Sequence, residues 1–242
     1  MTFINELLEF WINTHWLIAF LMSAMTNILV YVIASSFLSL VIGKLVERGQ
    51  GTHIDQRPLK EEQFRWEIKF GLTTCFIFAL GSLASRGLFD GLWPTSISDF
   101  AWQWVSFVVF YETYSYFVHR LLHLKPFSRY HYVHHWSVRV TPWSSYSVHP
   151  IEAAFIGFSA PIFMTMFSLS LGLALLFHVG GMVFTILLHS NFKIQSNNGL
   201  IQWVFKYSQD HSSHHRLGKF NFGFVNSFWD RVLNTRYRKV IE

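Results

Sequence analysis

HYVHH at residues 131–135 and HSSHH at residues 211–215 repeat one pattern, in which a histidine is followed after two residues by a pair of histidines. A third segment, HRLLH at residues 119–123, has two histidines four positions apart. Residues three or four positions apart lie on the same face of an α-helix, so each helical segment would offer two or three imidazoles to a common point. We therefore expect these segments to be helical and to present their histidines together.

Histidine is the residue type here that is best suited to bind metal, because neither carboxylates nor cysteines cluster in this chain. Imidazole is the commonest protein metal ligand and binds in its neutral form. Ligation by histidine alone suits iron, zinc or copper and argues against magnesium or calcium. Ten candidates exceed the four or so ligands of one structural zinc ion, which predicts two metal ions. The candidates are His119, His123, His131, His134, His135, His149, His189, His211, His214 and His215.

The remaining histidines are not expected to bind metal. His178 precedes His189 by three helical turns on the same face and would lie roughly 16 Å deeper in a membrane. We interpret it as a packing or substrate-channel residue. His15 and His53 are interpreted as surface histidines.

The composition is that of a membrane protein. Of 242 residues, 51% are hydrophobic and only 14% are charged, against a usual charged share of about 25%. The net charge of +5 does not indicate nucleic-acid binding, because no run rich in lysine and arginine occurs outside the loops that flank the membrane segments. Cys75 is the single cysteine, which excludes an intrachain disulfide and a thiolate zinc site; we expect it to be a small buried hydrophobic residue.

The apolar segments predict an all-α integral membrane protein with about five transmembrane helices, arranged as one span followed by two hairpins. A span needs about 20 apolar residues. The last segment is long enough for two short spans, with Gly172 or Gly180-Gly181 easing the turn or the packing. The expected segments are 16–43, 70–85 with an extension towards Trp93, 100–118, and 153–188.

Basic residues predict the orientation of these spans. Lysines and arginines are concentrated in the loop 44–69, in the segment 119–150 and after residue 190. The positive-inside rule places all three regions in the cytoplasm and the N-terminus outside. All ten candidate ligands then lie on one membrane face, in a cytoplasmic histidine-rich helical cap. The acidic residues Glu6 and Glu9 near the N-terminus argue against a cleavable signal peptide.

Carboxylates near the motifs are candidates for supporting the ligands, since a ligating imidazole usually donates its other N–H to a carboxylate or carbonyl. We expect Glu112, Glu152 and Asp210 in this role, with Asp230 as a further candidate. Glu112 lies seven residues before His119 inside an apolar segment, where acids are usually functional. Alternatively, Tyr114 or an arginine satisfies Glu112, and Asp230 forms a structural ion pair within Trp229-Asp230-Arg231.

The order of these motifs resembles the fatty acid hydroxylase superfamily, most closely the branch of sterol desaturases, C4-methyl sterol oxidases and bacterial lipid hydroxylases. The resemblance covers roughly residues 70–240. It divides the chain into an N-terminal transmembrane helix with a basic loop, 1–69, and a hydroxylase-like di-iron membrane domain, 70–242. The motifs are HRLLH (119–123), HYVHH (131–135), TPWSSYSVHPIE (141–152), HSNF (189–192), HSSHH (211–215) and NFGFVNSFWDRVLNTRY (221–237).

The resemblance implies an integral-membrane, non-haem di-iron enzyme that uses O2 to hydroxylate or desaturate a lipid. It implies two iron ions, which zinc can replace in purified protein. The histidines of the three motifs would be ligands, and His189 fits the lone histidine before the last motif. His149 matches a His-Pro-x-Glu element. Thr185 occupies the position at which fatty-acid and ceramide hydroxylases often have a histidine. This difference argues against membership of the fatty-acid and ceramide hydroxylase branch.

The resemblance also implies a separate electron donor, such as a ferredoxin, a rubredoxin or cytochrome b5. No haem-attachment, flavin or nicotinamide motif occurs in the sequence, and basic residues of the cap would dock an acidic carrier. The short chain and the absence of a lysine-based retrieval signal at Val240-Ile241-Glu242 favour the bacterial inner membrane over the endoplasmic reticulum.

Two functions of other classes remain open at this point. A haem-binding membrane electron carrier would need histidines that face each other within spans. A metal transporter or sensor would need ligands along a transmembrane path, where only Glu112 and His178 qualify. A zinc protease is disfavoured because no His-Glu-x-x-His motif occurs.

Overall fold

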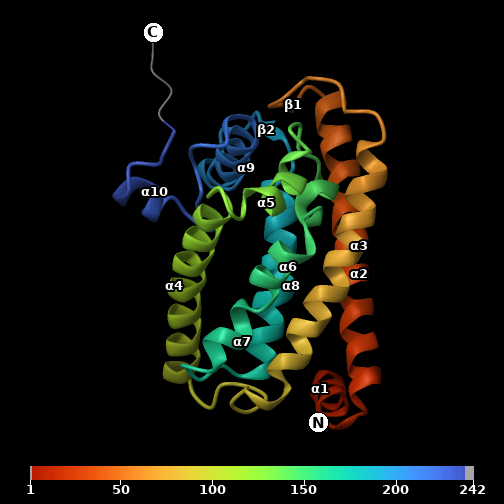
Figure 1. The fold of residues 1–242 in the computed structure, drawn as a ribbon, viewed down its shortest axis with the longest axis vertical. Coiled ribbons are helices and arrows are strands. Elements are labelled where there is room, and N and C mark those ends of the chain that lie inside the picture. Colours follow the sequence, from red (N-terminus) through yellow and green to blue (C-terminus); the bar gives the residue numbers. More distant parts are fainter. Residues whose placement is uncertain (1, 238–242) are drawn as a thin grey trace.

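The computed structural model describes residues 2–237 and is built almost entirely of helices (Figure 1). The residues Val240-Ile241-Glu242, used above to predict the membrane, lie outside this range. The long helices are α2 (Trp16–Glu47), α3 (Gln63–Ala84), α4 (Ile97–Leu122) and α8 (Leu171–Leu188). The shorter helices are α1 (Phe3–Asn13), α5 (Ser128–His135), α6 (Pro150–Gly157), α7 (Ser159–Met164), α9 (Gly199–Leu217) and α10 (Phe228–Val232).

Three smaller features complete the described chain. Two 3₁₀ turns are η1 (Ser85–Gly87) and η2 (Pro142–Tyr146). The strands β1 (Gly51–His53) and β2 (Phe192–Ile194) pair antiparallel, with Thr52 opposite Lys193. This short ribbon joins the loop after α2 to the segment that follows α8.

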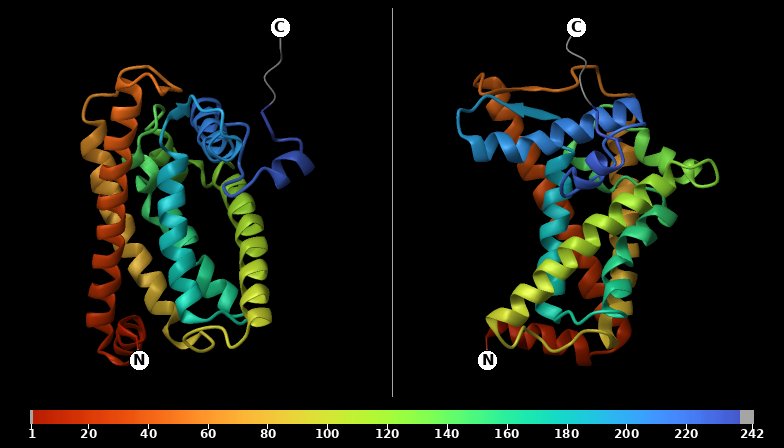
Figure 2. Two further views of the ribbon diagram at one scale, coloured as in Figure 1. Left: turned by 180° about the vertical axis from the view of Figure 1, so that it is seen from behind. Right: turned by 90° about the vertical axis from the view of Figure 1, so that its left-hand side faces the viewer.

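The long helices run along the long axis of the molecule, with α6 and α7 between α3 and α4 (Figure 1). At one end α9 lies across the ends of the long helices, and at the opposite end α1 lies across them (Figure 2). The helices α5 and α9 and the C-terminal ends of α4 and α8 therefore meet at the same end (Figure 1). All segments that carry the histidine motifs belong to this end.

The helices confirm an all-α membrane protein. Three of the described helices are long and apolar enough to cross a membrane: α2, α3 with its extension to Gly87, and α8. The segment expected over 100–118 is helical as part of α4. The boundary expected between residues 69 and 70 falls inside α3, which packs along α2.

Residues 153–188 were predicted to form a hairpin of two spans, and the structure differs from this prediction in the first half of the segment. That half is two short helices, α6 and α7, which break at Phe158. Pro161 explains the break, because its ring clashes with the carbonyl four residues earlier in a continuous helix. The chain turns at residues 165–170, and Gly180-Gly181 lies inside α8 rather than at the turn. Gly172 serves packing, since a Cβ there would lie 2.2 Å from Trp93 Cζ3.

Helix α1 is separate from the first span, which the sequence did not indicate. His15 is exposed, as predicted for a surface histidine, and it begins α2 by accepting the backbone N–H of Leu17 at its Nδ1. The Arg86 guanidinium, next to the end of α3, donates to the carbonyls of Ile12 and Thr14. These contacts fix α1 against the end opposite the histidine motifs.

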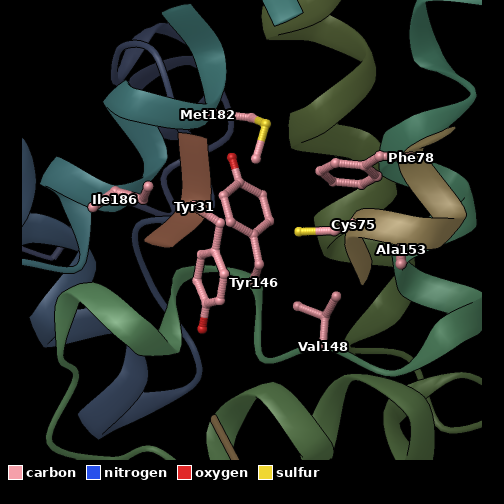
Figure 3. Close-up of a cluster of buried hydrophobic side chains, with 8 residues drawn as sticks. All are labelled: Tyr31, Cys75, Phe78, Tyr146, Val148, Ala153, Met182 and Ile186. Atoms are coloured by element: carbon pink, nitrogen blue, oxygen red, sulfur yellow. The ribbon is translucent and has the colours of Figure 1, made fainter. Parts of the chain in front are cut away.

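A buried hydrophobic cluster joins four helices and one turn (Figure 3). Tyr31 from α2 packs edge-on against Tyr146 of η2, with ring centroids 6.1 Å apart. Cys75 is fully buried, as expected for a small hydrophobic residue. The cluster consists of Tyr31, Cys75, Phe78, Tyr146, Val148, Ala153, Met182 and Ile186.

A buried carboxylate anchors the segment that follows α5. Glu67 of α3 accepts hydrogen bonds from Gln63 Nε2, Ser137 Oγ and Thr141 Oγ1, each at 2.7 Å. Its side chain is 1% exposed, so these three donors replace water for a group that is costly to bury. Glu67 therefore holds the chain between α5 and η2 against the membrane helices.

We expect Glu67→Ala to lower the thermal unfolding temperature of the detergent-purified protein by several degrees. The substitution leaves buried donors without an acceptor, at a cost of about 1–3 kcal/mol for each group that finds no new partner. Glu61→Ala removes an exposed carboxylate from the preceding loop and is the matched control. Equal unfolding temperatures for the two variants would contradict the anchoring role of Glu67.

Candidate metal centre

Nine of the ten candidate histidines converge at the end of the molecule where α4, α5, α8 and α9 meet. His119 lies in the last turn of α4, and His123 and His189 are the residues at which α4 and α8 end. The α5 motif and the α9 motif each contribute three imidazoles. Each motif is helical, as the spacing predicts.

The nine histidines form two separate clusters. Within each cluster the candidate ligand nitrogens all lie within 4.8 Å of one another. The first cluster has five members and the second has four. The first is His119, His123, His131, His135 and His214, and the second is His134, His189, His211 and His215.

Each His-x-x-His-His motif is divided between the two clusters. In α5 the i and i+4 residues, His131 and His135, belong to the first cluster, and His134 belongs to the second. In α9 the assignment is reversed, since His211 and His215 belong to the second cluster and His214 to the first. Adjacent helical residues point about 100° apart, so the paired histidines cannot point the same way. The expectation that one motif serves one point is therefore wrong.

The imidazoles face one another through their Nε2 atoms. In the first cluster, His131 Nε2 lies 3.1 Å from His119 Nε2 and 3.0 Å from His135 Nε2. In the second cluster, His189 Nε2 lies 3.3 Å from His134 Nε2 and 2.9 Å from His211 Nε2. Nitrogens that share a metal at about 2.1 Å lie at about these separations.

Hydrogen bonds at Nδ1 determine the tautomers of two members of the second cluster, His134 and His189. His189 Nδ1 lies 2.8 Å from the carbonyl oxygen of Thr185, and His134 Nδ1 lies 3.4 Å from that of Ser147. A carbonyl only accepts, so both Nδ1 atoms carry the proton and both Nε2 atoms present lone pairs. These lone pairs face each other across 3.3 Å. A shared cation would convert this repulsion into attraction.

The same constraint acts in the first cluster. His119 Nδ1 donates to the Phe222 carbonyl at 2.8 Å, and His214 Nδ1 donates to the Phe220 carbonyl at 2.6 Å. Both carbonyls come from the loop between α9 and α10. Residue types do not reveal this support, because a backbone carbonyl has no signature in the sequence.

Two carboxylates hold that loop in place. Asp230 accepts the backbone N–H groups of Phe222 and Gly223, both at 2.9 Å. Asp230 thus supports the metal centre through the loop rather than through an ion pair with Arg231. Gly223 is required here, since a Cβ would lie 2.3 Å from the Asn226 carbonyl oxygen.

Glu112 acts on the same loop and not on a histidine. Its Oε2 accepts the N–H groups of Val225 at 3.1 Å and Asn226 at 3.2 Å. The Tyr114 hydroxyl donates to the Phe155 carbonyl instead of to Glu112. Glu112 therefore fixes the loop to α4 through hydrogen bonds, at a position two helical turns before His119.

The other two predicted carboxylates differ in their distance from the clusters. Glu152 Oε1 lies 2.8 Å from His131 Nδ1, and the pair is almost completely buried. The Asp210 side chain makes no hydrogen bond to a histidine within residues 2–237; its backbone carbonyl accepts from Asn221 Nδ2 at 3.0 Å. Among the three predicted supporting carboxylates, Glu152 is the one that touches a cluster member.

His149, the tenth predicted ligand, lies outside both clusters. Its Nδ1 accepts the backbone N–H of Ile151 at 3.1 Å and so caps the start of α6. Its ring packs beside Tyr130, with centroids 4.8 Å apart. His53 is half-buried in β1 rather than on the surface, and His178 lies inside α8.

Burial keeps the clustered imidazoles neutral. Loss of solvation lowers the pKa of His123 to about 4 and that of His135 to about 3. Burial likewise holds the pKa values of His131, His134 and His214 well below the usual range. Metal binding needs neutral imidazole, so these side chains are ready to bind metal near pH 7.

An apolar cavity of about 370 Å³ starts at the clusters and extends between α4, α6 and α8. His119, His134 and His189 line it, and its wall also includes Phe107 and Phe177. Both clusters therefore adjoin a space that is shaped by the membrane helices.

Comparison with known proteins identifies a family and several relatives. The family model described as Fatty acid hydroxylase matches residues 104–235, which include both clusters. Human lathosterol oxidase is 27% identical over 71% of this chain and 60% of its own length. A Delta(7)-sterol 5(6)-desaturase of Leptosphaeria maculans is 31% identical over 55% of this chain and 36% of its own length.

The similarity covers only part of the relatives. A second Delta(7)-sterol 5(6)-desaturase, from Candida dubliniensis, is 28% identical over 57% of this chain and 34% of its own length. The chain thus spans between about a third and three fifths of these relatives. The comparison with solved structures gave no match. The family model covers more than half of the chain, and the chain therefore belongs to the fatty acid hydroxylase family.

Proposed function

We propose that this protein is a membrane-bound, non-haem di-iron oxygenase that hydroxylates or desaturates a lipid. It would use O2 and electrons from a separate carrier. The observation that carries the proposal is the pair of buried clusters, in which imidazole lone pairs face each other beside an apolar cavity.

The ligand set would be the nine clustered histidines. The five-membered cluster would hold one iron ion and the four-membered cluster the other. When bound, the iron ions supply the oxidising power that no side chain has. All-nitrogen donors also suit zinc, which we expect as a substitute in purified protein. Glu152 would orient His131, and the Phe220 and Phe222 carbonyls would orient His214 and His119.

The cavity supports a lipid substrate. Its walls are mainly apolar and aromatic, as in sites that hold apolar ligands. The relatives named as sterol desaturases and lathosterol oxidase point to the same class of substrate. A sterol, sphingoid or acyl chain in the cavity would bring a C–H bond to the end lined by His119, His134 and His189.

The electron donor would bind at the end that carries the clusters. Arg120, Lys125, Arg129 and Arg216 are exposed there, on or next to the motif helices. An acidic ferredoxin, rubredoxin or cytochrome b5 would complement this surface. The positive-inside rule places it in the cytoplasm, and we propose the bacterial inner membrane. Residues 70–242 would form the catalytic unit and 1–69 an N-terminal anchor with a basic loop.

The geometry of the clusters favours neither a haem-binding electron carrier nor a metal transporter. The nine imidazoles form two compact clusters at helix ends, whereas a haem carrier needs one facing pair. Such clusters also do not form the path of ligands through the membrane that a metal transporter needs.

We expect His215→Ala to abolish product formation and to lower bound metal from about two ions per chain to about one. Product would be measured as lipid that has gained one oxygen atom or lost two hydrogen atoms in expressing cells, and metal by elemental analysis. His149→Ala is the matched control, because His149 caps α6 outside both clusters. Full activity of His215→Ala at normal protein level would refute the proposed function.

We expect Asp230→Ala to reduce activity and metal retention by roughly 10–100-fold, a typical effect of removing support from a ligand. The loss of its carboxylate frees the loop that fixes His119 and His214. Asp210→Ala should have a much smaller effect, because its side chain contacts no clustered histidine. If Asp210→Ala lost as much metal as Asp230→Ala, the assignment of Asp230 as the support would be wrong.

A further inference from the structure

Two polar side chains meet within the membrane-spanning part of the molecule, away from both metal clusters. Asn27 of α2 is 2% exposed, and its Oδ1 lies 2.8 Å from His178 Nε2 on α8. Polar side chains are costly within a membrane and usually mark a functional position. Nothing in the proposed metal chemistry uses this pair.

The hydrogen bonds of Asn27 determine the tautomer of His178. Asn27 Nδ2 donates to the Cys75 carbonyl at 3.0 Å, so its Oδ1 must face His178. That oxygen only accepts, which places the proton of the neutral ring on His178 Nε2. His178 Nδ1 therefore carries a lone pair and can only accept a hydrogen bond.

This acceptor has no partner within the described residues. No hydrogen bond reaches His178 Nδ1 from residues 2–237, and the His178 ring lines the apolar cavity. The contact with Asn27 already ties α8 to α2 and uses only Nε2. A lone pair in an apolar wall costs free energy unless a donor meets it. His178 therefore offers an acceptor to a molecule inside the cavity.

The position of His178 along α8 sets the distance from the metal clusters. His178 precedes His189 by eleven residues, which at 1.5 Å per residue is roughly 16 Å. Both residues line the same cavity. A molecule that reaches both would have a donor group at one end and its reacting carbon at the other.

We propose that His178 binds a hydroxyl group of the lipid substrate in the part of the cavity that lies away from the clusters. This inference rests on the proposed function, because only that function makes the bound lipid a substrate. The hydroxyl donates to His178 Nδ1, and the carbon to be oxidised lies roughly 16 Å away, at the clusters. The enzyme would thus act far from the hydroxyl of its substrate and not on the carbons next to it.

The test measures binding of matched ligands to the intact purified protein in detergent, without reductant. The probes are radiolabelled hexadecan-1-ol, its methyl ether and hexadecane. The alcohol should bind about tenfold more tightly than the alkane, because this affinity ratio corresponds to the net free energy of one hydrogen bond. The ether has no donor and should bind like the alkane. Equal binding of alcohol and ether by the wild-type protein would overturn the proposal.

Variants at residue 178 assign the preference to this side chain. His178→Phe keeps a ring against Phe78 and should bind hexadecane normally while losing the preference for the alcohol. His178→Gln can donate to Asn27 and still accept from a ligand, so it should recover part of the preference. An unchanged alcohol-to-ether ratio in His178→Phe would refute the role of His178.

The binding test and the test of the proposed function can fail independently. Binding is measured without turnover, so an alcohol preference can appear in a protein that makes no product. Conversely, an active enzyme without the preference would retain the proposed function and lose this inference.

Discussion

The structure depends on the repulsion between imidazole lone pairs that are forced together. His134 and His189 each give their Nδ1 proton to a carbonyl, and their Nε2 lone pairs then face each other at 3.3 Å in a buried site. Water does not reach these atoms to solvate the lone pairs, and burial opposes protonation of His134. A metal cation bound at each cluster would remove this repulsion.

The long helices and the motif helices bring the histidines together at one end of the molecule. The long helices α4 and α8 end at His123 and His189, and α9 lies across those ends (Figure 2). Because α5 and α9 each send two histidines to one cluster and one to the other, both clusters share the same two helices. This arrangement links the two clusters and places both beside the cavity between α4, α6 and α8.

Much of this organisation could be predicted from residue types and their spacing. Long apolar runs predict spans, and histidines at helical spacing predict helical motifs that bring many imidazoles to the same end of the molecule. Other features could not be predicted, because they depend on tertiary contacts. The division of each motif between two clusters depends on how α5 and α9 face each other. The helix-capping role of His149 and the anchoring role of Glu67 depend on local backbone geometry. The break at Phe158 could have been inferred from Pro161, which has a direct steric effect on helix continuity.

The most direct test of this account is X-ray absorption spectroscopy of the purified wild-type protein after loading with iron. The account predicts two iron ions per chain, each with a first shell dominated by imidazole nitrogen. A single ion per chain, a sulfur ligand or the absorption spectrum of haem would contradict it.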